Sequence, residues 1–209
     1  MKLIGFSIAN LKDLLDVLKE DRTKEILSSF CCDLNPDVES FLQNSAIEFQ
    51  KQGISSTHLV FSSYKGDAVL VAYFTLANKF LTIPKKTLSN SLSKKINKFG
   101  VFNRDIKAYQ LSCPLIAQLG KNYHNNYNKL ITGDELLKIA CDEIQKIQLS
   151  IGGKMAYVEC EDIAQLIDFY ESNGFVRLHD RYLTKSEKSE TEPDYLLTQI
   201  GRASCRERV

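Results

Sequence analysis

The stretch Ser112–Leu137, SCPLIAQLGKNYHNNYNKLITGDELL, joins an apolar run, a polar loop and the start of a helix. The apolar run ends at Leu119 and predicts a buried strand that breaks at Gly120. A helix is predicted to start at Thr132, because Thr132 and Glu135 have the spacing of a capping box. The first N–H groups of a helix lack acceptors within the helix, so such a connection can hold a phosphate. Every α/β protein has joints of this kind, and the surrounding chain decides what this one does.

Length and composition predict a soluble globular protein. The chain has 209 residues, of which 44% are hydrophobic and 25% are charged, and these values are ordinary for one domain with a substantial core. No apolar run reaches the ~20 residues that a membrane helix needs. The N-terminus shows no signal-peptide pattern. We therefore expect a cytoplasmic protein without a membrane partner.

The last ten residues, 200–209 (IGRASCRERV), resemble the translated read-through of a sequencing adapter. We set them aside as a non-native tail and expect one domain over residues 1–199. Without this tail the chain has 24 basic and 25 acidic residues, a balance that gives no general argument for nucleic-acid binding. Five cysteines remain, with no CxxC spacing, and they predict reduced, buried thiols and no metal site.

The first half of the chain predicts three strands and two helical regions. The strands are expected over 2–8, 57–62 and 68–76. The third of these is apolar on both faces and so central in a sheet. One or two short helices are expected over 11–27, and Asn35-Pro36 predicts the start of another helix that ends at Gly53.

The second half begins with a basic segment, residues 85–107, that has seven basic residues and one acidic residue. It has no firm period, though Leu88, Leu92 and Ile96 would share one helix face. The elements expected after it are a strand from residue 107 or 108, a helix from Thr132, a strand over Met155–Cys160, a helix over 162–173 closed by Gly174 and Phe175, and strands over 175–178 and 195–199. A polar linker, Lys185–Pro193, separates the last two strands.

This order of elements predicts a mixed α/β (α+β) fold in a single domain. We expect a central, mostly antiparallel sheet of about six to seven strands, flanked by about four helices. The strand, helix and strand between residues 108 and 160 predict one parallel pair, joined by a right-handed crossover.

The order of elements, together with FYESNGF at Phe169–Phe175, resembles the GNAT superfamily of acetyl-CoA-dependent N-acetyltransferases. The likeness spans nearly all of residues 1–199. Two further stretches, Phe30–Phe61 and Ala72–Pro84, are similar to the GNAT toxins of toxin–antitoxin modules. The resemblance implies an acyltransferase in which an acceptor amine attacks acetyl-CoA directly, without a metal. Likeness of fold supports acyl-CoA chemistry better than it supports any one acceptor.

The resemblance also implies where acetyl-CoA binds. The strand ending at Leu119 would splay from the strand Met155–Cys160, and the cofactor would lie in the opening. Pantetheine would pair with backbone near Leu119, Gly120 and Lys121. Pyrophosphate would meet N–H groups around Ile131, Thr132, Gly133 and Asp134, with Lys129 or Lys121 adding positive charge.

The phosphate loop departs from the family pattern Gln/Arg-x-x-Gly-x-Gly/Ala. Aligned on its last glycine, this chain has Asn128-Lys-Leu-Ile131-Thr-Gly133, so an asparagine and an isoleucine replace two pattern residues. Asp134 and Glu135 also place negative charge where phosphates would arrive. We still expect acetyl-CoA to bind, because backbone donors do most of the work at such sites.

Two residues are the candidates for proton transfer. The resemblance implies that Tyr170 is the acid that protonates the departing CoA thiolate, and the alternative is a core tyrosine on the apolar face of its helix. Glu159 is the one acid in its apolar strand and is either the general base or a solvated side chain. His58 and His124 are the other titratable candidates, and Cys160 is expected to be packing rather than a nucleophile.

The sequence does not identify the amine that accepts the acetyl group. If the basic segment borders the acceptor groove, an anionic acceptor such as aminoacyl-tRNA is favoured. Contact with the CoA phosphates and a solvated loop are the alternatives. Toxin-like acetylation, protein N-termini, lysines and small amines are all open, as is a homodimer. A hypothesis from a different functional class is a GNAT-fold interaction protein with little or no catalysis. The altered phosphate loop is the reason for this hypothesis.

Overall fold

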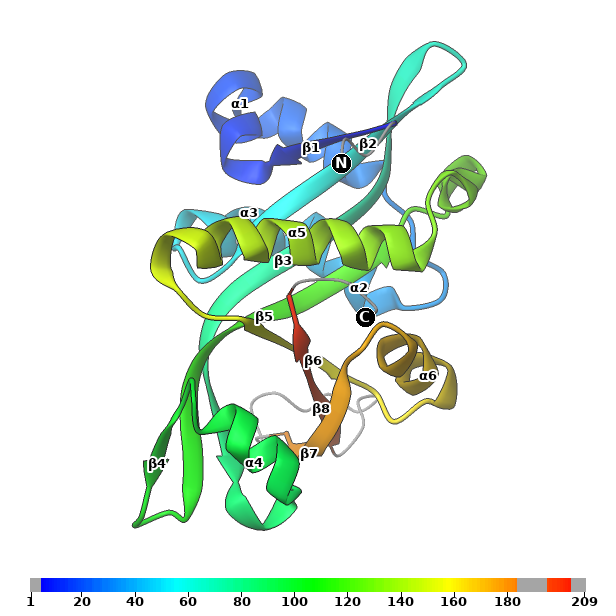
Figure 1. The fold of residues 1–209 in the computed structure, drawn as a ribbon. Coiled ribbons are helices and arrows are strands. Elements are labelled where there is room, and N and C mark those ends of the chain that lie inside the picture. Colours follow the sequence, from blue (N-terminus) through cyan, green and yellow to red (C-terminus); the bar gives the residue numbers. More distant parts are fainter. Residues whose placement is uncertain (1–4, 184–194, 204–209) are drawn as a thin grey trace. The chain divides into compact units, whose positions relative to one another are not determined.

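The computed structural model describes residues 5–183 and 195–203 (Figure 1). The chain forms two compact units, each built from two separate stretches. The first unit comprises Met1–Ala77 and Ile116–Ala140, and the second comprises Asn78–Leu115 and Cys141–Val209. Three elements run from one unit into the other: β3 (Asp67–Pro84), β5 (Ala108–Lys121) and α5 (Gly133–Ile151).

The described strands form one sheet in the order β1-β2-β3-β5-β6-β8-β7, with β4 beside β5. The remaining strands are β1 (Phe6–Asn10), β2 (Ser56–Tyr64), β4 (Val101–Asn103), β6 (Met155–Cys160), β7 (Val176–Tyr182) and β8 (Tyr195–Arg202). Among them one neighbouring pair is parallel, which confirms the predicted mixed α/β class. The sheet has eight strands rather than six to seven, because β4 lies in the basic segment where no strand was predicted. No helix in the described ranges has the length and apolar character to cross a bilayer.

The first unit carries the N-terminal helices in the predicted places. The side chain of Asn10 accepts the N–H of Lys12 at 2.9 Å and so starts α1 (Leu11–Ser28). Lys19 interrupts this helix with a φ of 65°, which leaves two short helical pieces. The side chain of Asn35 accepts the N–H of Asp37 and Val38, and α2 (Pro36–Ser40) continues through a π-helical turn into α3 (Ala46–Lys51).

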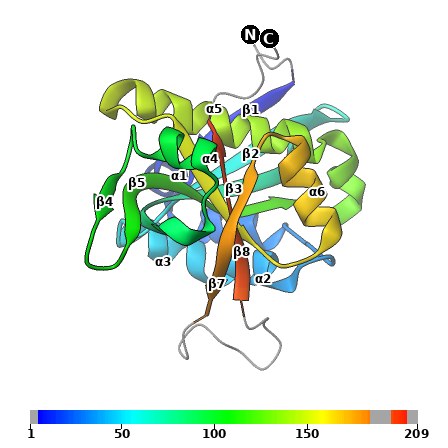
Figure 2. The same ribbon diagram turned by 60° about the horizontal axis from the view of Figure 1, so that its bottom comes forward.

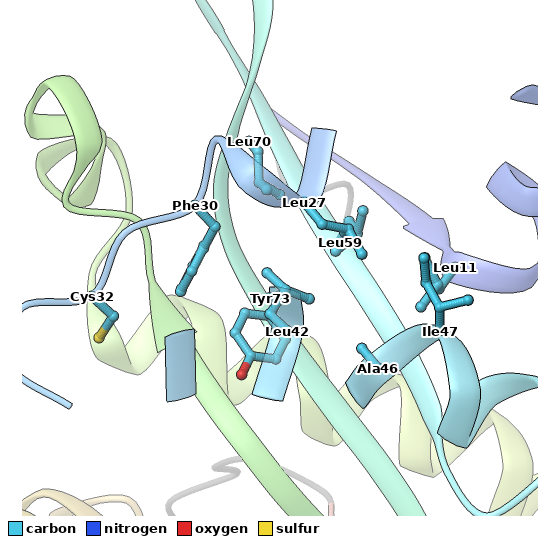
Figure 3. Packing of buried hydrophobic residues seen from close by; sticks show 10 residues of the cluster. All are labelled: Leu11, Leu27, Phe30, Cys32, Leu42, Ala46, Ile47, Leu59, Leu70 and Tyr73. Atoms are coloured by element: carbon cyan, nitrogen blue, oxygen red, sulfur yellow. The ribbon is translucent and has the colours of Figure 1, made fainter. Parts of the chain in front are cut away.

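A hydrophobic cluster holds the first unit together (Figure 3). Its members come from α1, the segment after α1, the π-helical turn, α3, β2 and β3: Leu11, Leu27, Phe30, Cys32, Leu42, Ala46, Ile47, Leu59, Leu70 and Tyr73. The rings of Phe30 and Tyr73 meet edge to face, with centroids 5.0 Å apart. Phe30 and Cys32, at the start of the stretch Phe30–Phe61 that carried the resemblance, are therefore core residues.

In the second unit the basic segment folds further than its pattern predicts. Ser89 caps α4 (Asn90–Ile96) by accepting the N–H of Leu92 at 3.2 Å, and Ile96 is fully buried. A hairpin then pairs β4 with the start of β5, with Phe102 opposite Tyr109. Of the predicted helix face Leu88, Leu92 and Ile96, the last two lie in α4 and Leu88 lies before it.

The end of α6 (Ala164–Ser172) follows the predicted glycine cap. The N–H of Phe175 donates to the carbonyl of Tyr170 at 3.0 Å, and the N–H of Gly174 donates to that of Glu171 at 2.9 Å. These two bonds are the Schellman motif, and they require the left-handed backbone of Gly174, whose φ is +85°. The rings of Tyr170 and Phe175 lie 5.7 Å apart and close the motif. Figure 2 shows α6 beside β7 and β8.

The final strand runs past the predicted end. β8 continues to Arg202, so Ile200, Gly201 and Arg202, which we set aside, pair with β6. Ile200 is 1% exposed, and the backbone of Gly201 lies against the ring of Phe175. The non-native origin of residues 200–209 stays a prediction. The linker Lys185–Pro193 lies outside the described residues.

Replacing Gly174 tests the cap. No atom lies within 4 Å of a Cβ added there, so Gly174→Ala costs only the strain of a left-handed alanine, about 1–2 kcal/mol of unfolding free energy. Gly174→Asn is the matched control, since asparagine tolerates this conformation, and we expect it to lose less. Urea denaturation measures both. Equal losses in the two variants would contradict the assignment.

Candidate functional site

The end of β5 carries the first predicted cofactor residues. Leu119 and Lys121 are half-buried and Gly120 is buried. The predicted break at Gly120 is wrong, because β5 continues through it to Lys121. A Cβ at position 120 would lie 2.4 Å from Cγ1 of Val38 and 3.3 Å from Cε1 of Tyr73. The glycine therefore marks a close approach of α2 to the strand rather than a turn.

Side chains of the first unit form the floor beneath Gly120. The Tyr73 hydroxyl donates to the carbonyl of Val38 at 2.5 Å, which ties β3 to the first turn of α2. Burial raises the pKa of Tyr73 well above its ordinary value, so this phenol stays neutral and remains a donor. Phe30 packs against the same ring. The backbone at Leu119–Lys121 is thus held by a rigid, uncharged support.

Asn122 is the residue that sequence reasoning missed. Its side chain is fully buried directly after the last residue of β5. Its Oδ1 accepts the N–H groups of Cys31 and His124, each at 3.0 Å. Its Nδ2 donates to the carbonyls of Leu70 at 2.8 Å and Ser29 at 3.1 Å. The amide therefore joins β3, the segment after α1 and the loop; an asparagine directly after an apolar strand was the available signal.

The loop after Asn122 is structured rather than open. Residues His124–Leu130 form 3-10 turns in which Asn125 and Asn126 take left-handed backbone, with φ of 50° and 61°. The ring of Tyr127 packs against Tyr64 of β2, with centroids 5.6 Å apart. Lys121 Nζ donates to the carbonyl of Asn128 at 3.3 Å and so spans the loop. Lys129 is exposed, and Ile131 is buried at the end of the loop.

The start of α5 is the predicted capping box. The N–H of Thr132 donates to the Glu135 carboxylate at 2.8 Å, and the N–H of Glu135 donates to Oγ1 of Thr132 at 3.2 Å. These bonds use two donors of the helix start and hold a carboxylate beside it. Gly133 and Asp134 supply the first helical N–H groups. An arriving anion meets a helix terminus that already carries negative charge, and Lys121 and Lys129 lie in the same connection.

Tyr170 lies on α6 in the second unit, with 8% of its surface exposed. Its ring packs against Phe169 and Phe175. No other described residue forms a hydrogen bond with its hydroxyl. Burial raises the pKa of Tyr170 above its ordinary value, so the phenol is protonated at neutral pH. It is a proton donor whose O–H is not used within the described part of the chain.

Glu159 does not lie in solvent. Its carboxylate pairs with Nε of Arg181 at 2.9 Å, and its side chain is 16% exposed. On β8, Thr198 lies opposite Glu159, and His179 of β7 lies opposite Thr198, so the three share one row across β6, β8 and β7. As a base, Glu159 would have to work from within this ion pair.

The remaining titratable candidates are His58, His124 and Cys160. The ring of His58 stacks on Phe74 with centroids 4.8 Å apart, and His124 is an exposed loop residue. Burial raises the pKa of the Cys160 thiol, which disfavours the nucleophilic thiolate. Four of the five described cysteines are buried, and none forms a disulfide. The described ranges contain no cluster of three His, Cys, Asp or Glu side chains that could hold a metal ion.

Comparison with known proteins finds solved structures that share the fold of this chain. No protein-family model matches this sequence, and no curated protein matches it either. A solved structure of the AtaT toxin with a tyrosine-to-phenylalanine substitution matches with a TM-score of 0.61 and 14% identity, over 95% of this chain and 90% of that chain. AtaT complexed with acetyl-methionyl-tRNAfMet matches at 0.60 and 16% identity, over 92% of this chain and 93% of that one. AtaTR bound with AcCoA matches at 0.56 and 15% identity, over 95% and 94%.

The chain has the fold of the GNAT toxins. This confirms the predicted resemblance at the level of the fold, since it covers nearly the whole of both chains. In this GNAT fold the eight predicted cofactor residues belong to the first unit: Leu119, Gly120, Lys121, Lys129, Ile131, Thr132, Gly133 and Asp134. Tyr170 and Glu159 belong to the second. Their roles stay predictions.

The hydrogen bonds of Asn122 can be tested by Asn122→Ala. The change removes four hydrogen bonds, one of them buried and three partly buried, and we expect a loss of about 3 kcal/mol of unfolding free energy. Asn97→Ala is the control, because Asn97 is exposed, and its effect should stay within about 0.5 kcal/mol. Guanidinium denaturation followed by circular dichroism measures both. A loss for Asn122→Ala as small as the control's would show that the amide does not hold the loop.

Proposed function

We propose that this protein is an N-acetyltransferase that transfers the acetyl group of acetyl-CoA to an acceptor amine. The observation that carries the proposal is the GNAT-toxin fold over nearly the whole chain, together with a neighbour bound to AcCoA. Pantetheine would bind along Leu119–Lys121, and pyrophosphate would bind at the start of α5, with Lys121 and Lys129 compensating the acids there. No metal takes part in this scheme.

Direct transfer accounts for every proton. The amine nitrogen attacks the thioester carbonyl, the C–N bond forms, and the C–S bond breaks to release the CoA thiolate. Tyr170 gives its phenolic proton to that sulfur, a role that fits a neutral phenol with an unused O–H. Glu159 or a water molecule accepts the proton that the nitrogen loses. Solvent then returns the phenolic proton.

For the acceptor, we propose the α-amine of an aminoacyl-tRNA. A neighbour of this fold was solved with acetyl-methionyl-tRNAfMet. The basic segment of this chain, residues 85–107, provides positive charge that suits a polyanionic acceptor. An antitoxin is the further partner that this analogy suggests, since one neighbour is bound to the C-terminus of AtaR.

The second candidate is an interaction protein of the same fold without catalysis. The observation that favours it is the start of α5, where the capping box occupies two donors and holds a carboxylate. Isothermal titration with acetyl-CoA separates the two candidates. Binding in the micromolar range supports the enzyme, and no heat and no thermal shift at millimolar acetyl-CoA would favour the interaction protein.

Tyr170→Phe is the test of the acid. We expect turnover to fall by roughly 10²–10⁴-fold, because the thiolate then leaves without a proton donor. Acetyl-CoA affinity should change little, since the ring and its packing remain. The measurement is transfer of labelled acetyl to pooled aminoacyl-tRNA, with titration calorimetry for affinity. Tyr182→Phe, at a tyrosine that is 72% exposed, is the matched control and should keep full activity. Lost affinity in Tyr170→Phe would point to packing instead.

The pH profile of turnover gives an independent check. The folded-state pKa of Tyr170 is raised, so the acid form persists at every pH below about 10. The rate should rise as the acceptor amine loses its proton and then stay level to about pH 9.5. Release of the CoA thiol, followed across pH, measures this. An alkaline decline below pH 9 that vanishes in Tyr170→Phe would mean that the phenol ionises early, against the burial argument.

A further inference from the structure

A hollow in the second unit is not used by the proposed acetyl transfer. Its volume is about 430 Å³, within the range of small-molecule sites. Helix α4 and the turn after it form one wall, and the ends of β6, β7 and β8 form the other. Figure 2 shows α4 beside the end of β8 and the start of β7. We call this hollow the α4 pocket.

Four cations line the α4 pocket. Lys95 and Lys98 come from α4 and the turn that follows it, and Lys154 precedes β6. Arg202 ends β8 and belongs to the tail 200–209 that we predict to be non-native. All four are exposed, and none of their charged groups pairs with another described residue. No acidic residue is among the described residues of the lining. Like charges gathered without a counter-ion favour an anion as ligand.

The body of the pocket is apolar. On β8, Ile200 lies opposite Tyr157 of β6 and Val176 of β7, and Arg202 lies opposite Met155. Alternation along the strands places Met155, Ile200, Val176 and Arg202 on one face of the sheet. Ile200 is buried, whereas Val176 is 51% exposed at the rim.

Phe99 supplies an aromatic face across from this floor. Its ring is 42% exposed although it lines the pocket. Its backbone is held, since the N–H of Phe99 donates to the carbonyl of Ile96 at 2.9 Å and Ile96 is fully buried. The N–H of Ala203 donates to the carbonyl of Lys154 at 3.2 Å, which fixes the opposite wall. The pocket is therefore preformed by backbone bonds on both sides.

We propose that the α4 pocket binds a nucleoside monophosphate. The base would lie between Phe99 and the apolar floor at Val176 and Ile200, since aromatic side chains stack on bases of any sequence. The phosphate would meet Lys95, Lys98, Lys154 and Arg202, which supply charge-assisted donors. A cluster of cations alone would suit any anion, and an apolar surface alone would suit any apolar ligand. Their combination in about 430 Å³ fits a ligand with a planar ring and a phosphate. The inference goes beyond acetyl transfer and does not depend on it.

Calorimetric titration of the full chain with 5′-AMP, and then with the other three 5′-monophosphates, tests the site at low ionic strength. We expect saturable binding for all four, weakened as salt rises. Adenosine and inorganic phosphate, titrated separately, should each bind at least tenfold more weakly than AMP, because each uses half of the pocket. Phosphate that binds as tightly as AMP would overturn the assignment of the apolar floor.

Two matched pairs of variants locate the binding. Lys95→Ala should weaken AMP binding about tenfold, the loss expected for one charged hydrogen bond, and Lys94→Ala should not, since Lys94 lies on the same exposed helix outside the lining. Phe99→Ala should weaken binding similarly, and Phe80→Ala, at a phenylalanine that is 78% exposed in the same unit, should not. Equal effects within either pair would overturn the proposal.

Acetyl-CoA contains a nucleotide, so its binding is measured on the same variants. Unchanged acetyl-CoA affinity in Lys95→Ala and Phe99→Ala, with AMP binding lost, supports a separate site. AMP binding that acetyl-CoA abolishes and that the pocket variants leave intact would overturn it, because AMP would then occupy the cofactor site. A trinucleotide that binds more than tenfold tighter than AMP, with the same need for Lys95, would assign the pocket to a nucleotide within a chain, and equal affinity would assign it to the free nucleotide.

Discussion

The buried amide of Asn122 is the constraint on which the first unit depends. Its backbone N–H donates to the carbonyl of Val71, and its side chain makes four further bonds to Ser29, Cys31, Leu70 and His124. The bond to the carbonyl of Leu70 is buried, and a buried polar group left without a partner costs about 1–3 kcal/mol; the other three side-chain bonds are partly buried. The amide therefore sets where β5 ends and how the loop leaves it. The proposed binding of pantetheine and pyrophosphate depends on the path that the backbone takes after β5.

Close packing around Gly120 complements this polar anchor. Val38, Phe30 and Tyr73 fill the space that a side chain would need, so the strand backbone comes within contact of α2. The tyrosine hydroxyl then bonds to the carbonyl of Val38, which joins the hydrophobic cluster to the helix start. A backbone edge that must pair with a ligand benefits from such a rigid, uncharged support.

The second unit uses burial to keep its reactive groups neutral. Tyr170, Tyr157 and Cys113 all have pKa values raised by burial, and that of Cys113 rises to about 12. A neutral phenol is an acid and a neutral thiol is a weak nucleophile, so burial favours proton donation by Tyr170 over covalent catalysis by a cysteine. The one described acid of β6, Glu159, instead forms an ion pair with Arg181. The second unit therefore contains both an ion pair on its sheet, Glu159 with Arg181, and an aromatic cluster around Tyr170 of α6.

Local chemistry could be predicted from the residues, and contacts between distant segments could not. The capping box at Thr132, the Asn35 cap, the glycine closure at Gly174 and the strand Met155–Cys160 all lie where the pattern placed them, because each depends on neighbours within a few residues. The close packing at Gly120, three of the four side-chain bonds of Asn122 and the pairing of Glu159 with Arg181 depend on groups 22 to more than 90 residues away. So does the convergence of Lys95, Lys154 and Arg202 on one pocket. Sequence period records which face of an element is buried, but only the tertiary structure decides which side chains meet across it.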